Sequence, residues 1–205
     1  MGKNVVEFRG IDNLVYAEVL TDSVDGITFG PVKPLVPVAE LSKTTSSDSA
    51  TKYYDNQPMI NVKSTGPDEV TVTCAVLDLE TLAELTGQDF DKELQMIMDG
   101  ENTSKEFAIG YRTKDTGGQY RYIWRLKGNF STPDEASATE DDGTDSKNQE
   151  LKYTGVSTIH KFLKDGKSRK SINVQQNDKV DLTSWFTTVQ TPDTVKVKAS
   201  APASL

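Results

Sequence analysis

Two alternating runs joined by a glycine turn near the middle of the chain constrain its fold most. The first run is Glu106-Phe-Ala-Ile-Gly-Tyr-Arg112, and the second is Tyr120-Arg-Tyr-Ile-Trp-Arg-Leu-Lys127. In both runs apolar or aromatic side chains recur at every second position, as in strands that bury one face. Gly117 and Gly118 between them can adopt the positive φ that a hairpin turn requires. The pattern therefore predicts two half-buried antiparallel strands.

Shorter alternating runs extend this β pattern along the chain. They cover 15–20, 59–63, 70–76 and 150–156, and a turn is predicted at 65–68 from its Gly-Pro pair. Pro31, Pro34 and Pro37 punctuate the segment 32–41, between the first and second of these runs. This indicates an edge strand or an extended arm, because proline donates no ladder hydrogen bond.

One short helix is predicted over 79–86. Asp78 is placed to accept hydrogen bonds from the first turn, and Gly87 is placed to end the helix. Residues 89–98 fit either a helix or a strand, and we favour a strand because Gly87 and two aspartates interrupt the helical pattern.

The inward faces of these elements define a candidate core. Its predicted members are Val72, Leu82, Phe107, Tyr122, Trp124 and Leu126. On the opposite side of the central strand lie Arg121, Arg125 and Lys127, a basic face that must pair with acids within the subunit or across a subunit boundary.

Two long polar segments, at about 42–55 and 129–149, contain little to bury. A structureless connection of this length inside a domain is usually functional or disordered. We expect both to be loops that leave the domain and contact a neighbouring subunit.

Composition limits the class of protein. A chain of 205 residues suits one all-β domain, here 1–199, followed by a loose C-terminal arm at 200–205. The net charge of −8 disfavours broad attraction to nucleic acid. No apolar run reaches the roughly 18 residues of a membrane span, and the start does not read as a signal peptide. A single cysteine fits folding in a reducing cytoplasm.

No catalytic or metal-binding pattern stands out. His160 is the only histidine and Cys74 the only cysteine, too few for a structural zinc site. The stretch 141–145 lacks the ligand spacing of an EF-hand. Acidic residues are plentiful, but no pair of carboxylates is singled out. We therefore expect a protein that is not an enzyme and that uses no cofactor or metal.

Five ordered stretches resemble the major tail protein, the tail-tube subunit of long-tailed, non-contractile bacteriophages. They are Tyr53-Tyr-Asp-Asn56, Val70-Thr-Val-Thr-Cys-Ala-Val-Leu-Asp-Leu79, Phe107-Ala-Ile-Gly-Tyr-Arg112, Gly118-Gln-Tyr-Arg-Tyr-Ile-Trp-Arg-Leu-Lys-Gly-Asn-Phe130 and Pro133-Asp-Glu-Ala-Ser-Ala-Thr139. Each stretch is weak alone, and the resemblance rests on their order and spacing between Asn4 and Val189.

The resemblance implies a β-sandwich or small barrel of antiparallel strands with one flanking helix. It also implies a virion protein, assembled in the host cytoplasm into stacked hexameric rings that form a hollow tube for DNA. Its partners would be itself, the tape-measure protein, the tail terminator and the distal tail protein, with DNA passing unbound and no membrane anchor. The basic face of Arg121, Arg125 and Lys127 departs from a uniformly acidic conduit. The alternatives are the tube protein of a contractile injection system and a glycan-binding β-sandwich module of a tail tip.

The candidate contact residues between subunits or rings come from the two polar segments and a basic cluster near 158–170. They are Thr44, Thr45, Ser46, Asp48, Tyr53, Tyr54, Asp55, Asp134, Glu135, Glu140, Asp141, Asp142, Lys167, Arg169 and Lys170.

Overall fold

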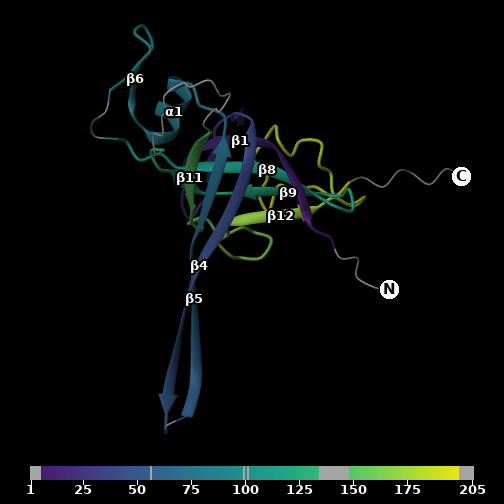
Figure 1. The fold of residues 1–205 in the computed structure, drawn as a ribbon. Coiled ribbons are helices and arrows are strands. Elements are labelled where there is room, and N and C mark those ends of the chain that lie inside the picture. Colours follow the sequence, from purple (N-terminus) through teal and green to yellow (C-terminus); the bar gives the residue numbers. More distant parts are fainter. Residues whose placement is uncertain (1–5, 56, 99, 101, 134–147, 199–205) are drawn as a thin grey trace, which may run out of the picture.

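The structure is a computed structural model that describes residues 6–55, 57–98, 100, 102–133 and 148–198. It is mainly β, with antiparallel sheets that curl into a half-barrel and one short helix among the described residues (Figure 1). The fold class predicted from the sequence is thus confirmed.

The first sheet has the order β12-β9-β8-β1-β2, with β3 paired to β1. Its strands are β1 (Phe8–Asp22), β2 (Ile27–Phe29), β3 (Lys33–Pro34), β8 (Phe107–Asp115), β9 (Tyr120–Arg125) and β12 (Ser171–Gln175). The predicted central hairpin is β8–β9, which pairs from Ile109 opposite Arg125 to Lys114 opposite Tyr120. Gly118 has a φ of 84° in its turn, as the glycine pattern indicated.

The second sheet has the order β10-β11-β5-β4. Its strands are β10 (Gly128–Phe130), β11 (Gln149–Gly155), β5 (Gln57–Cys74) and β4 (Val38–Tyr54). The predicted loop over 42–55 is therefore wrong, because most of it belongs to β4. The turn predicted at 65–68 is also wrong, because Gly66 and Pro67 lie inside β5, beside a register shift between Thr45 and Ser47.

The helix α1 (Leu79–Thr86) has the predicted ends. The Asp78 carboxylate accepts the backbone N–H of Thr81 at 2.9 Å, and Gly87 ends the helix in the left-handed conformation with a φ of 72°. The segment after it forms the two-stranded sheet β6 (Asp89–Asp91) and β7 (Met96–Met98), which confirms strand over helix and adds a turn between them.

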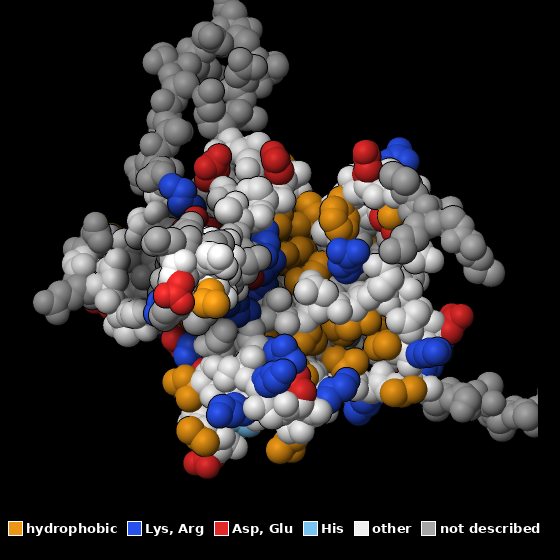
Figure 2. Space-filling view, turned by 90° about the horizontal axis from the view of Figure 1, so that it is seen from below, with side chains coloured by type: hydrophobic (Ala, Val, Ile, Leu, Met, Phe, Trp, Pro, Cys, Tyr) orange, Lys and Arg blue, Asp and Glu red, His pale blue; other side chains and the backbone are white. Residues whose placement is uncertain are grey.

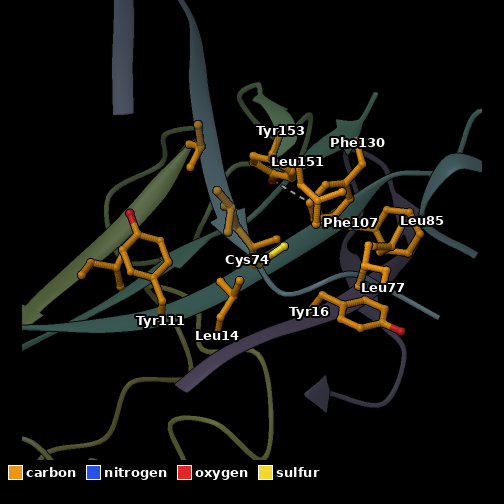
Figure 3. Close-up of a cluster of buried hydrophobic side chains, with 14 residues drawn as sticks. Leu14, Tyr16, Cys74, Leu77, Leu85, Phe107, Tyr111, Phe130, Leu151 and Tyr153 are labelled. Atoms are coloured by element: carbon orange, nitrogen blue, oxygen red, sulfur yellow. Dashed lines mark hydrogen bonds between the residues drawn. The ribbon is translucent and has the colours of Figure 1, made fainter. Parts of the chain in front are cut away.

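The middle of the first sheet is buried on both faces, so the prediction that β8 and β9 bury only one face is wrong there. Phe107, Ile109 and Ile123 face the second sheet, where Phe107 packs with Phe130 and its carbonyl accepts the Tyr153 hydroxyl at 2.9 Å (Figure 3).

The other face of the first sheet carries Ala108, Trp124 and Leu126, which are covered by Phe162 and Trp185 from later in the chain. Of the predicted core, Val72, Phe107, Trp124 and Leu126 are buried, whereas Leu82 and Tyr122 are half-buried and pack against it.

Candidate assembly site

The outer part of the β4–β5 hairpin projects from the domain as a two-stranded ribbon (Figure 1). Its pairing continues from Ser47 opposite Thr65 to Tyr54 opposite Gln57, and Asp55 takes a φ of 49° at the turn. The eight residues from Ser47 to Tyr54 span roughly 25 Å at about 3.3 Å per residue. In the described part of the chain no third strand joins the ribbon, so both of its edges are unpaired.

The ribbon and its base carry every contact residue predicted for the first polar segment. Thr44, Ser46 and Asp55 are exposed, whereas Thr45 is half-buried and donates a hydrogen bond to Asp68 at 2.9 Å. The side chains of Asp48, Tyr53 and Tyr54 lie outside the described part of the structure, although their backbones are in the ribbon or its turn.

A buried ion cluster anchors the base of the ribbon to the first sheet. Asp68 on β5 accepts Arg125 Nη1 at 2.7 Å, and both side chains are only 7% exposed. Lys43 and Lys170 approach the same carboxylate at 3.6 Å and 3.9 Å, and Arg125 Nη2 also donates to the Tyr111 hydroxyl at 3.1 Å. Removing one partner of such a pair leaves an uncompensated buried charge, which typically costs about 3–5 kcal/mol.

Two of the three cations of the predicted basic face pair with acids within the subunit, whereas Arg121 is exposed and lies over the Phe8 ring at 5.0 Å. Besides the Arg125–Asp68 pair, Lys127 Nζ lies 2.9 Å from Asp22 and 3.1 Å from Glu106. The pKa of Lys127 is raised: burial alone would lower it, but hydrogen bonds to these two carboxylates outweigh the burial. The alternation of the sequence shows that these cations share a face, but it carries no sign of their distant partners.

The predicted basic contact residues lie in or beside the turn before β12. Arg169 pairs with Asp165 four residues earlier, and Lys170 donates to the Gly66 carbonyl at the ribbon base. Lys167 is exposed. The acidic residues proposed to meet this cluster lie outside the described residues, namely Asp134, Glu135, Glu140, Asp141 and Asp142.

The same turn presents an apolar side chain on a fixed backbone. Leu163 is 89% exposed, yet its N–H and that of Lys164 both donate to the Asp193 carboxylate at 2.9 Å, and neighbouring Phe162 is buried. Leu94, Met96 and Met98 are also exposed, at the β6–β7 hairpin. Sequence reasoning missed these exposed groups because it placed apolar residues in the core by default.

An open groove lies between the sheets on the side of the ribbon. It encloses about 710 Å³ and is lined by side chains of β1, β4, β8, β9 and β12. Figure 2 shows hydrophobic side chains inside the hollow, with Lys and Arg side chains beside it. No sequence motif marks this groove, because its lining comes from five strands that are spread along the sequence.

Cys74 and His160, the two residues considered for catalysis, are both packed against other side chains. Cys74 is fully buried, and this burial raises the pKa of its thiol. His160 packs edge-on against Phe162 at 5.1 Å, and its backbone N–H donates to Asp22 at 2.9 Å. Within the described ranges no group of three or more His, Cys, Asp or Glu residues is arranged to hold a metal ion. None of the described helical structure is long and apolar enough to cross a bilayer.

Comparison with known protein families and with curated protein sequences finds no match to this chain.

Proposed function

We propose that this chain is a structural subunit that self-assembles, through its β4–β5 ribbon, into the stacked rings of a phage tail tube. The observation that carries the proposal is the ribbon itself, which projects from the domain and has no further strand on either edge in the described part of the chain. The sequence resemblance supplies the kind of assembly, and the antiparallel β fold is compatible with it.

The ribbon has a physical reason to seek a partner. A lone two-stranded hairpin is at best marginally stable in water, and open strand edges are templates for pairing with another chain. A neighbouring subunit that pairs with an edge, or covers a face, would supply the missing contacts.

Exposed apolar groups add to this support. Leu163 stands on a turn whose backbone is held by Asp193, so binding would order little that is not already ordered. Exposed apolar groups that cluster are typical of interaction sites, and Leu94, Met96 and Met98 lie together on the β6–β7 hairpin. These groups suit contacts between subunits.

The tube itself follows from the resemblance. Hexameric rings, passage of DNA without specific binding, and contact with tape-measure, terminator and distal tail proteins are part of the proposal. A net charge of −8 is favourable for such a conduit, because like charges repel the phosphate backbone.

The test is negative-stain microscopy and sedimentation of the purified protein at rising concentration, with a variant in which residues 49–63 are replaced by Asn-Gly. Asn-Gly closes a tight hairpin, and Asp48 and Ser64 at its flanks already pair. We expect wild-type protein to form tubes and the shortened variant to remain a folded monomer.

The control exchanges the facing pair Ser47 and Thr65, as Ser47→Thr with Thr65→Ser, and keeps the ribbon length. It should assemble as wild type does. Tubes of normal length from the shortened variant would remove the ribbon from the assembly mechanism. A wild-type protein that stays monomeric and binds glycans would favour the tail-tip alternative, and co-purification with a sheath protein would favour a contractile system.

A further inference from the structure

The groove between the sheets combines an apolar floor with a free strand edge. Ile11, Tyr111 and Ile123 of the first sheet line it, together with Leu41 of β4. β4 is the edge strand of the second sheet, paired with β5 on one side and with no described strand on the other. An extended polypeptide can therefore add to β4 and cover the floor at the same time.

The groove is positively charged although the chain is acidic. Lys43, Arg121 and Arg125 line it against the single carboxylate Glu40. Asp68 behind the lining is shared by Arg125, Lys43 and also Lys170. Four cations thus face two carboxylates, an excess of two positive charges in a chain whose net charge is −8.

Two buried polar atoms of the lining have no partner among the described residues. They are Arg125 Nε and Thr113 Oγ1. Arg125 as a whole is only 6% exposed, so its unpaired N–H is costly in the free protein. Of the two lining arginines, Arg121 is exposed, and a carboxylate brought into the groove would form charge-assisted hydrogen bonds with it.

We propose that this groove binds an extended segment of a partner protein, in which one carboxylate lies two residues from apolar side chains. In a strand, positions i, i+2 and i+4 share a face. The carboxylate would therefore meet Arg121, with the charge of the buried Arg125 nearby, while its apolar neighbours cover Tyr111 and Ile123, and the backbone would pair with β4. This inference is independent of ring formation, since the groove lies within a single subunit.

The experiment uses fluorescence anisotropy with a labelled heptapeptide, Val-Thr-Glu-Thr-Val-Thr-Val, and its analogue with Gln in place of Glu. The full chain is held at concentrations where sedimentation shows a monomer. We expect saturable binding of the Glu peptide, binding of the Gln analogue weaker by about tenfold, and a similar loss in Arg121→Gln. Raised salt should weaken the Glu peptide more than its analogue.

The matched control is Arg112→Gln, which removes a half-buried cation of the same sheet that pairs with Asp12 outside the groove. Its affinity should stay within about twofold of wild type. Equal binding of the two peptides, equal losses in the two arginine variants, or no saturable binding up to about 1 mM would overturn the proposal. Self-association that is lost in Arg121→Gln without any peptide binding would assign the groove to a second copy and would also overturn it.

Discussion

Adding one carbon atom, a Cβ at Gly110 on β8, tests how tightly the first sheet is packed. Gly110 pairs with Trp124 on β9, and a Cβ added there would lie 2.8 Å from Cε2 and Cζ2 of the indole. Carbon atoms normally approach to about 3.5–4.0 Å. The ring cannot move aside easily, because Trp124 is fully buried and its Nε1 donates to the Trp185 carbonyl at 2.8 Å. Gly110→Ala should therefore lower the free energy of unfolding by about 1–3 kcal/mol.

The measurement is urea unfolding of the monomer, read as a shift of midpoint at unchanged slope. Gly10→Ala on β1 is the matched control, since a Cβ there meets nothing within 4 Å, and it should be neutral or stabilising by up to about 1 kcal/mol. In a Trp124→Leu background the cost of Gly110→Ala should shrink, because the indole is gone. Equal effects of the two glycine substitutions, or an undiminished cost in that background, would refute the packing described for this sheet.

Three further predictions concern single groups. Asp78→Ala should cost about 1 kcal/mol by removing the helix cap, whereas Asp78→Asn should restore most of the melting temperature; equal losses would show that the cap is not what matters. Burial alone would raise the pKa of Asp22, but hydrogen bonds from the Ile159 N–H and Lys127 outweigh it and lower the pKa. The carboxylate therefore stabilises the fold fully above its unfolded pKa of about 3.9 and loses this contribution as pH falls through the lower folded value. Asp22→Asn should be less stable than wild type at pH 7 in urea titrations, with a gap that narrows below about pH 4, and a gap independent of pH would contradict this. Cys74 should react with a thiol reagent only slowly in the folded protein because burial raises its pKa, and labelling as fast as in urea would place it at the surface.

Local signals in the sequence were sufficient for the central hairpin and the helix. β8 and β9 are adjacent in the chain, and the residues of their turn select its geometry. The helix likewise begins after Asp78 and ends before Gly87, because each of these capping residues satisfies backbone groups within one turn of itself. Such features depend on neighbours only a few residues away.

Two strands were predicted within β5, at 59–63 and 70–76, but its continuity between them and the part of β4 over 42–54 were missed because their signals conflict. Serines, threonines and Asp48 read as a loop in isolation, and a Gly-Pro pair reads as a turn. Pro67 is nevertheless tolerated in β5, because pairing with β11 ends at Asp68 and leaves the strand with one neighbour at the proline. Only the pairing of β4 with β5 reveals the strand.

The burial of Arg125 and Lys127 could not be predicted from the sequence for a different reason. Arg125 and Asp68 are 57 positions apart, and Lys127 and Asp22 are 105 apart. A period of two assigns a side chain to a face, but it does not say what covers that face. The partners depend on the topology that brings β5 and the end of β1 beside β9.

The ribbon's own energetics connect the fold to the proposed assembly. Its base is held by the buried Asp68–Arg125 pair and by Thr45, whereas beyond Ser47 it has two strands and no described core beneath it. Ordering each residue costs roughly 1–2 kcal/mol of backbone entropy, and two strands alone recover little of that. The outer ribbon should therefore open without unfolding the domain. A neighbouring subunit that pairs with it would order it and bind it in the same step, so the stability of the ribbon and the strength of the assembly would rise and fall together.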